Sequence, residues 1–300
     1  MELRKLGTEK INPSLRNLDT KSSLEIARII NKEDAKVATA VKRVLPQIAK
    51  AIDLIAEGLR HGGRLMYVGA GTSGRIAALD AAECPPTFNT DPKTVQFVIA
   101  GGPKALAAAV EANEDSRSLG QREIARKKPG KHDVVVGIAA SGRTPFTVAA
   151  IEYARRRGAK AVAVTCNRNS PLARAANLAI VTEVGPEVIA GSSRMKAGTA
   201  QKMVLNMLST GAMTRLGYIY GNLMVNVHLK NEKLLQRGIT ILQTATGVNR
   251  ETAERTLKAA GSVSIGLIML EAGVSRQTAI RTLRSAGGNA RKAIADARSL

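Results

Sequence analysis

The chain of 300 residues is long enough for one large domain with a small appendage, since domains usually run to about 100–200 residues. Its apolar fraction of 44% excludes wholesale disorder, and no uninterrupted apolar run reaches the length of about 18 residues that could span a membrane. The charge is unusual, because 45 Lys and Arg against 24 Asp and Glu give +21. This excess makes nucleic acid the first partner to consider.

The distribution of the basic residues argues against a nucleic-acid partner. Residues 1–150 hold 23 basic and 16 acidic side chains, and residues 151–300 hold 22 and 8. Aromatic residues, which serve as stacking platforms for bases, make up only 2%. The densest basic run, Arg155 to Arg157, closes a helical pattern, where cations complement the negative end of the helix dipole. We therefore expect no nucleic-acid partner.

Cysteine usage and the first residues of the chain indicate the compartment. Cys84 and Cys166 lie in different segments, outside any array with metal-ligand spacing, and we expect buried, inert thiols. Residues 1–15 contain no apolar stretch of the kind found in signal peptides. The sequence predicts a cytoplasmic protein that holds no metal and binds no membrane.

Residues 1–54 predict an N-terminal helical segment. Ser22 and Glu25 have the spacing of a capping box, and apolar residues between Val37 and Ile55 recur every three or four positions. Short apolar runs follow, and each is expected to form a strand. These runs are residues 65–68, 95–100, 134–138, 161–165 and 178–181.

The apolar runs are nearly continuous, which is typical of parallel strands buried on both faces. Helical patterns separate most of them, including residues 104–114 and 145–157. This alternation predicts an α/β domain with a doubly wound parallel sheet over residues 55–220. Ligands of such domains bind at the carboxyl ends of the strands, so the loops there are the candidate site.

Residues 221–300 lose the strand pattern and predict a linker helix followed by a small helical unit. Within them, residues 247–257 repeat as residues 273–283. Asn249 and Ser275 are expected helix N-caps, and Gly261 and Gly287 are expected C-terminal stops. The basic residues of this unit are interpreted as a solvated surface in preference to a nucleic-acid face.

Two hydroxyl-bearing loops follow expected strands and open expected helices. The first, GAGTSGR, contains Thr72 and Ser73, and the second contains Ser141 and Thr144. Backbone N–H groups and hydroxyls at helix starts suit an anion, so the pair predicts a compact phosphoryl ligand. A tight structural turn is the alternative for the first loop. In the polar loop over residues 191–202, cations could either hold an anion or stabilise the structure.

Carboxylates are the candidates for acid and base chemistry, because the three histidines are scattered. Glu83 precedes Pro85 and Pro86, which are expected to end its helix. Glu111 and Glu114 are three residues apart and would project to one side of a helix. A solvated acidic helix end is the alternative for this second pair.

Six motifs occur in order: GAGTSGR, DAAECPPTF, EANEDSR, IAASGRTPF, GSSRMKAGTAQK and NEKL. Together they resemble the N-acetylmuramic acid 6-phosphate etherase family from about Leu24 to the C-terminus. The resemblance implies a sugar-isomerase-type phosphosugar-binding domain and a C-terminal helical unit of the UBA-like (ubiquitin-associated) kind. The related glucokinase regulatory protein binds its ligand without transforming it, so the fold alone does not imply catalysis.

The resemblance implies a carbon–oxygen lyase that splits the D-lactyl ether of N-acetylmuramic acid 6-phosphate by elimination and hydration. It implies no metal or organic cofactor, and a homodimer. By motif match, Glu83 is the catalytic acid and Glu114 the second catalytic carboxylate. The matched substrate-binding residues are Thr72, Ser73, Glu111, Ser141, Thr144 and Lys233, and this lysine is expected to reach the ligand of a neighbouring subunit.

Two other functions compete with the enzyme. A non-catalytic phosphosugar-binding regulator would keep the loops, but Glu83 and Glu114 favour catalysis. A nucleic-acid-associated regulator is suggested by the charge alone, and no helix-turn-helix pattern is evident near the N-terminus. We expect a small phosphosugar as the ligand.

Overall fold

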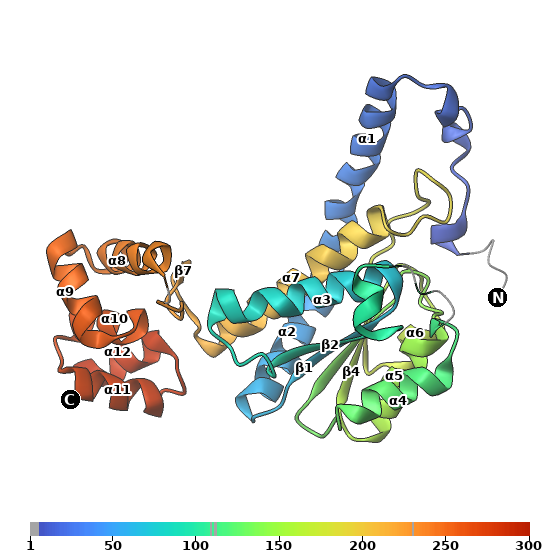
Figure 1. The fold of residues 1–300 in the computed structure, drawn as a ribbon. Coiled ribbons are helices and arrows are strands. Elements are labelled where there is room, and N and C mark those ends of the chain that lie inside the picture. Colours follow the sequence, from blue (N-terminus) through green and yellow to red (C-terminus); the bar gives the residue numbers. More distant parts are fainter. Residues whose placement is uncertain (1–5, 109, 111–112, 230) are drawn as a thin grey trace. The chain divides into compact units, whose positions relative to one another are not determined.

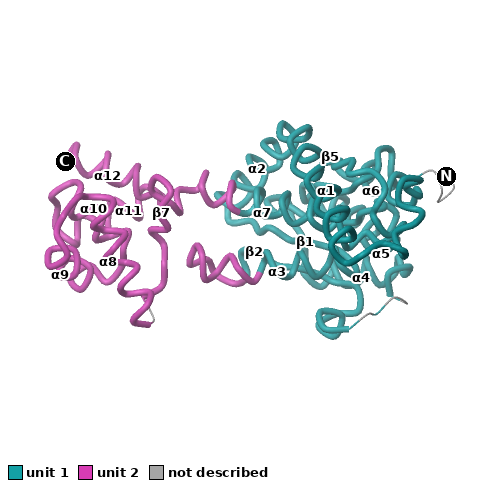
Figure 2. Tube along the Cα trace, turned by 90° about the horizontal axis from the view of Figure 1, so that it is seen from above, with its two compact units in different colours: residues 1–81, 93–209 teal, residues 82–92, 210–300 magenta. Residues whose placement is uncertain are grey.

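The computed structural model describes residues 6–108, 110, 113–229 and 231–300 (Figure 1). Two compact units are distinguished in Figure 2. The sheet unit comprises residues 1–81 and 93–209, and the helical unit comprises residues 82–92 and 210–300.

The sheet unit opens with helical elements. Short 3₁₀ helices η2 (Gly7–Glu9), η3 (Pro13–Leu15) and η4 (Leu18–Thr20) precede α1 (Ser23–Lys42) and α2 (Leu45–Arg60). The predicted capping box is confirmed, because the Ser22 hydroxyl accepts from the Glu25 N–H while the Glu25 carboxylate accepts from the Ser22 N–H. The helical pattern is interrupted between α1 and α2, where Val44 has a non-helical conformation ahead of Pro46.

The predicted parallel sheet is confirmed, with strand order β2-β1-β3-β4-β5. The strands are β1 (Leu65–Gly69), β2 (Val95–Ile99), β3 (Val134–Ile138), β4 (Lys160–Thr165) and β5 (Leu178–Val181). The helices of this unit that follow strands are α3 (Gly71–Phe88), η5 (Gly102–Leu106), α4 (Arg117–Arg126), α5 (Pro145–Arg156), α6 (Pro171–Ala175) and α7 (Lys196–Leu216). The first and last of these, α3 and α7, extend into the helical unit.

Helices cover both faces of the sheet. Alternate side chains of a strand point to opposite faces, so each strand packs against helices on both sides. Met66 and Val68 pack in one core cluster with side chains of α4, α5 and α6, such as Phe146. Tyr67 points to the other face, where its hydroxyl donates to Asp80 of α3 at 2.8 Å. Both faces are therefore buried, which explains the continuous apolar runs.

Two details of the expected helices are wrong. Residues 104–114 do not form one helix: Gly101 and Gly102 have φ of 86° and 65°, and the 3₁₀ helix η5, which begins at Gly102, ends at Leu106. Pro85 and Pro86 do not end α3, which continues to Phe88. The φ of proline is compatible with a helix, and its carbonyl still accepts: the Asn89 N–H bonds the Pro85 carbonyl at 2.9 Å.

Besides the ends of α3 and α7, the described residues of the helical unit form a two-stranded hairpin and five helices. They are β6 (Ile219–Tyr220), β7 (Leu223–Met224), α8 (Glu232–Thr246), α9 (Arg250–Ala260), α10 (Val263–Ala272), α11 (Arg276–Ser285) and α12 (Ala290–Arg298). Asn249 and Ser275 are N-caps of α9 and α11, as the repeat predicts. Gly261 ends α9 in the left-handed conformation, and Gly287, with φ of 62°, follows the end of α11.

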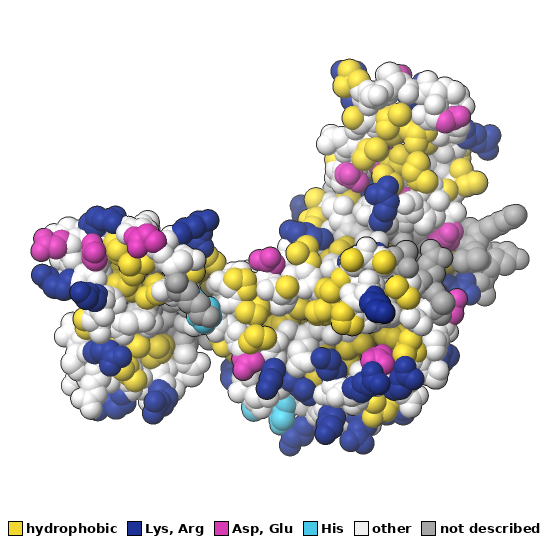
Figure 3. Space-filling model, in the orientation of Figure 1, with side chains coloured by type: hydrophobic (Ala, Val, Ile, Leu, Met, Phe, Trp, Pro, Cys, Tyr) yellow, Lys and Arg dark blue, Asp and Glu magenta, His cyan; other side chains and the backbone are white. Residues whose placement is uncertain are grey.

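Basic side chains are numerous where helices of the sheet unit end. Arg60, Arg126 and the pair Arg155 and Arg156 occupy the last turns of α2, α4 and α5. In Figure 3, many Lys and Arg side chains lie along the bottom of the sheet unit, and others are scattered over the rest of the visible face. Cations there complement the negative ends of the helix dipoles. Among the described residues, no helix is long and apolar enough to cross a membrane.

Candidate active site

The loop after β1 requires glycine at two positions, one because of close packing and one because of backbone conformation. A Cβ on Gly69 would lie 2.9 Å from the Gly74 nitrogen, so the strand can approach the first turn of α3 only without a side chain. Gly71 begins α3 with φ of 50°, a conformation that favours glycine. Thr72 and Ser73 follow in the first turn, where backbone N–H groups of a helix remain available to an anion.

The loop after β3 is held in a tight turn beside the first loop. The Gly142 N–H bonds the Ala139 carbonyl at 2.9 Å, and the Arg143 N–H donates to the Ser141 hydroxyl at 3.2 Å. Gly142 has φ of 67°, and a Cβ there would lie 2.3 Å from the Ser170 hydroxyl oxygen. Thr144 is the N-cap residue of α5, with Pro145 in the first turn as predicted.

The two loops line one pocket of about 340 Å³ at the carboxyl edge of the sheet. The polar residues that line it are Glu9, Thr72, Ser73, Arg75, Glu114, Ser141, Thr144 and Ser193. Five predicted site residues thus meet in one cavity. Because β1 and β3 are neighbours in the sheet, loops distant in the sequence become adjacent there.

Glu114 contributes the carboxylate that faces the first loop. Its Oε1 lies 3.0 Å from the position that a Cβ on Gly71 would take. Its own carbonyl accepts from the Phe146 N–H at 3.0 Å, which ties Glu114 to the start of α5. Glu114 lies in a turn, so its expected helical placement is wrong, and the pocket replaces the alternative of a solvated helix end.

The N-terminal segment supplies a carboxylate that the sequence analysis missed. Glu9 lines the pocket, and the adjoining Thr8 is 1% exposed. The Gly7 N–H donates to the Asn167 side-chain oxygen at 2.8 Å, and the Asn167 amide donates to the Thr8 hydroxyl at 3.3 Å. These partners are about 160 positions apart, so no local pattern reveals the contact.

Arg75 is a cation that lines the pocket. Its guanidinium donates to the carbonyls of Leu106 and Ala108, at 3.3 Å and 2.6 Å. Arg75 therefore holds the segment after η5 against α3 while it contributes positive charge to the pocket. Arg75 is part of the GAGTSGR motif, but the sequence alone does not indicate a role for it.

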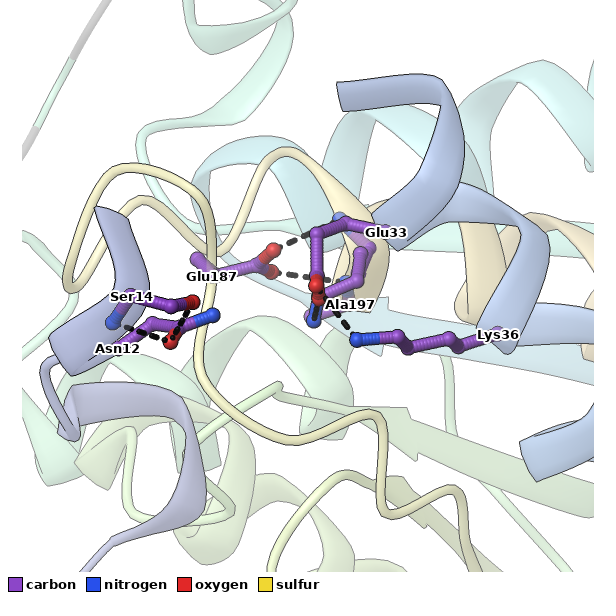
Figure 4. Close-up of polar contacts among 7 residues, drawn as sticks. Asn12, Ser14, Glu33, Lys36, Glu187 and Ala197 are labelled. Carbon is purple, nitrogen blue, oxygen red and sulfur yellow. Dashed lines mark hydrogen bonds and ion pairs between the residues drawn. The ribbon is translucent and has the colours of Figure 1, made fainter. Parts of the chain in front are cut away.

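The buried lysine of the third polar loop has a structural role. Lys196 is 1% exposed, and its ammonium donates to Glu33 of α1 at 2.7 Å. Glu187 accepts from the N–H groups of Lys196 and Ala197, both at 2.9 Å, so a carboxylate of the chain occupies the α7 N-terminus. Figure 4 shows the Glu187 carboxylate directed at Ala197, with Glu33 beside Lys36. The cations of this loop were expected either to hold an anion or to stabilise the structure, and Lys196 stabilises the structure.

The pKa values of these acids follow from their surroundings. Burial raises the pKa of the Glu187 carboxyl, against the opposing effect of the N–H groups of Ala197 and Lys196. Burial also acts to raise the pKa of Glu33, but hydrogen bonds from Lys196 and Lys36 outweigh it and lower the pKa. Glu33 and Lys196 therefore form a charged pair inside the protein.

Comparisons with known proteins identify the family. The model of the glucokinase regulatory protein N-terminal SIS domain matches residues 47–155, and that of the SIS domain matches residues 129–211. An N-acetylmuramic acid 6-phosphate etherase of Symbiobacterium thermophilum is 58% identical and covers 90% of each chain. One of Streptomyces avermitilis is 51% identical, covering 99% of this chain and 96% of its own. The chain belongs to the N-acetylmuramic acid 6-phosphate etherase family.

A solved structure with low sequence identity has the same fold as this member of the etherase family. The phosphoheptose isomerase of Francisella tularensis is 18% identical, with a TM-score of 0.53, and the match covers 65% of this chain and 100% of that one. The predicted fold class is thereby confirmed. The predicted family is confirmed by the etherases of Symbiobacterium and Streptomyces.

Two described residues that match the etherase motifs, Glu83 and Lys233, lie outside the pocket lining. Glu83 is exposed on α3, in the segment that belongs to the helical unit. Lys233 is exposed in the first turn of α8, also in the helical unit. Glu111 lies outside the described residues. The etherase pocket thus brings together the phosphate-type loops and one of the two matched catalytic carboxylates.

Among the described residues of the etherase chain, no histidine or cysteine lines the pocket. Within the residues that the structure describes, no group of three or more His, Cys, Asp or Glu side chains could hold a metal ion. His61 and His132 stack on each other with ring centroids 5.5 Å apart. Cys84 and Cys166 are buried, as expected, and burial raises the pKa of the Cys166 thiol to about 12.

Proposed function

We propose that this protein is a carbon–oxygen lyase that cleaves the D-lactyl ether of N-acetylmuramic acid 6-phosphate. The products are N-acetylglucosamine 6-phosphate and D-lactate. The observation that carries the proposal is that residues of two phosphate-type loops and Glu114 line one pocket. Relatives that carry the etherase name support the substrate.

The phosphate is assigned to the two loops at the carboxyl edge of the sheet. Thr72 and Ser73 offer hydroxyls in the first turn of α3, and Ser141 and Thr144 offer hydroxyls from the second loop. An anion there meets backbone N–H donors and the positive end of the helix dipole. The guanidinium of Arg75 adds a full positive charge to the same cavity.

The sugar then extends toward carboxylates, which suits an elimination. In the ring-opened aldehyde, the proton on C2 is acidic, and a carboxylate removes it. The electron pair forms the C2–C3 double bond, the C3–O bond breaks, and the lactyl oxygen takes a proton from a carboxyl group. Water then adds its oxygen to C3 and a proton to C2. We assign Glu83 as the acid and Glu114 as the second carboxylate of this pair, with Glu111 holding sugar hydroxyls.

This chemistry can be tested directly by incubating the protein with N-acetylmuramic acid 6-phosphate and measuring D-lactate. Release by the unaltered protein, and its loss in Glu114→Gln, are expected. Glu114→Gln should still bind N-acetylglucosamine 6-phosphate, because the phosphate loops are intact. Binding of the phosphosugar without release of D-lactate by the unaltered protein would instead assign a non-catalytic regulator.

We also propose that the protein acts as a homodimer in the cytoplasm, where phosphorylated sugars are retained. Apolar side chains left uncovered near the N-terminus support a second copy: Ile11 and Leu24 are 69% and 59% exposed. Lys233 is assigned to the ligand of the neighbouring subunit by its motif.

Mixing two inactive variants tests this arrangement. If Lys233→Ala and Glu114→Gln chains exchange partners, half of the dimers are mixed and each has one intact site, so about one quarter of the activity should return. Mixtures that stay inactive although subunits exchange would rule out a lysine shared in this way.

A further inference from the structure

Gln201 on α7 is the buried neighbour of a phosphate-loop hydroxyl. It is 1% exposed, and its side-chain oxygen accepts from the Ser73 hydroxyl at 3.0 Å. The side-chain nitrogen of Gln201 is fully buried and has no hydrogen-bond partner among the residues that the structure describes. A buried amide donor without a partner is rare in proteins and calls for an explanation.

The direction of this hydrogen bond conflicts with the phosphate role of Ser73. A serine hydroxyl carries a single proton. While that proton is donated to the Gln201 oxygen, Ser73 can offer only lone pairs to the pocket. An oxygen lone pair repels a phosphate oxygen, so the loop would lose one of its donors just where Ser73 lines the cavity.

A half-turn of the amide removes the conflict. The oxygen and nitrogen of a glutamine side chain exchange places on such a turn with almost no change in shape. The nitrogen would then donate to the Ser73 oxygen, and the Ser73 proton would be free for the phosphate. The carbonyl oxygen would take the place without a partner, which is tolerated in buried sites more often than an unpaired N–H.

We propose that Gln201 is a positioning residue whose amide nitrogen donates to Ser73 and thereby directs the Ser73 proton to the substrate phosphate. This inference rests on the proposed function, since it assumes that the phosphate binds at Ser73. Gln201 does not itself line the pocket; it acts through the serine.

The test is a double-mutant cycle between Gln201 and Ser73, read as KM and kcat. Gln201→Met preserves length and removes the amide, and it should raise KM about tenfold with kcat little changed. In the Ser73→Ala background the same substitution should leave KM unchanged, because the hydroxyl that it orients is absent. Thr199→Ala, an exposed position two residues before Gln201 on α7, is the control and should alter neither constant.

A merely structural role predicts a different result. In that case Gln201→Met would lower the thermal unfolding temperature and raise KM equally in both backgrounds, which would overturn the inference. If Gln201→Met does not fold, Gln201→Asn, which withdraws the amide but stays polar, is put through the same cycle with the same expectations. Failure of the unaltered protein to release D-lactate would reject the proposed function, whereas an active enzyme without coupling between the two positions rejects only the role of Gln201.

Discussion

The ammonium of Lys196 lies 2.7 Å from the carboxylate of Glu33, and this contact joins the start of α7 to the middle of α1. Both side chains are almost wholly withdrawn from water: 1% of the Lys196 side chain and 10% of the Glu33 side chain are exposed. Removing charges from water is costly, so each of them depends on the other.

Substitution of Glu33 should therefore be strongly destabilising. Glu33→Ala leaves Lys196 charged and buried without its carboxylate, and we expect a loss of about 3–5 kcal/mol in the free energy of unfolding, measured by chemical denaturation. Lys36→Ala is the control, because Lys36 pairs with the same carboxylate but is 56% exposed and should cost less than about 1 kcal/mol. Equal losses in the two variants would contradict the dominant role of the buried pair.

Gly71→Ala should impair the pocket more than the fold. The positive φ of Gly71 makes alanine cost about 1–2 kcal/mol, and the new Cβ would stand 3.0 Å from Glu114 Oε1. Displacement of that carboxylate should lower kcat/KM for lactate release at least about tenfold. Gly62→Ala is the matched control, since Gly62 has φ of 76° with nothing within 4 Å of its Cβ position. It should lose similar stability and keep its activity.

Asp133 should contribute an acid-dependent part of the stability. Burial opposes its ionisation, but hydrogen bonds from Arg64 and from the Gly130 N–H outweigh this and lower its pKa. The native protein thus binds the proton less tightly than the unfolded chain. The stabilisation is present above the unfolded pKa of about 3.9 and is lost as the pH falls through the lower native pKa.

The Asp133→Asn variant isolates this effect. Between about pH 5 and about pH 2, the free energy of unfolding of the unaltered protein should fall more steeply than that of the variant. Urea denaturation at each pH measures the two slopes. Parallel slopes would show that Asp133 does not carry this part of the acid dependence.

Both thiols should resist alkylation in the native protein. Cys84 and Cys166 are 2% and 4% exposed, and the Cys166 pKa of about 12 leaves almost no thiolate near neutral pH. Iodoacetamide at about pH 8 should modify neither cysteine before unfolding and both afterwards, as counted by mass spectrometry. Rapid modification of native Cys166 would point to local opening around β4 and β5.

Glu83→Gln should abolish release of D-lactate, because an amide cannot supply the proton for the departing ether oxygen. Glu83 is exposed, so the unfolding temperature should stay close to that of the unaltered protein. Glu57→Gln, which alters a carboxylate that is 60% exposed on α2, is the control and should remain active. Near-normal turnover by Glu83→Gln would remove Glu83 from the proposed mechanism.

The strands and phosphate loops could be predicted because their signals are local. Continuous apolar runs mark strands covered on both faces, and hydroxyls that begin three residues after Gly69 and Ile138 mark the carboxyl edge. Glu114 lines the pocket but does not lie on the predicted helix, because Gly101 and Gly102, at the start of η5, have a left-handed conformation that redirects the chain. Glu9 could not be found at all, since its place depends on a contact between Gly7 and Asn167.

The register of β1 with β3 has a consequence for the order of assembly. Leu65 pairs with Val134, and the Arg64 N–H bonds the Asp133 carboxylate across 69 positions. One of the two hydroxyl-bearing loops of the pocket follows each of these two strands. A nascent chain therefore has no phosphosugar site until β3 has left the ribosome and docked beside β1. Ligand binding would then report completed pairing at the centre of the sheet, and a phosphosugar added during refolding should favour this pairing by mass action.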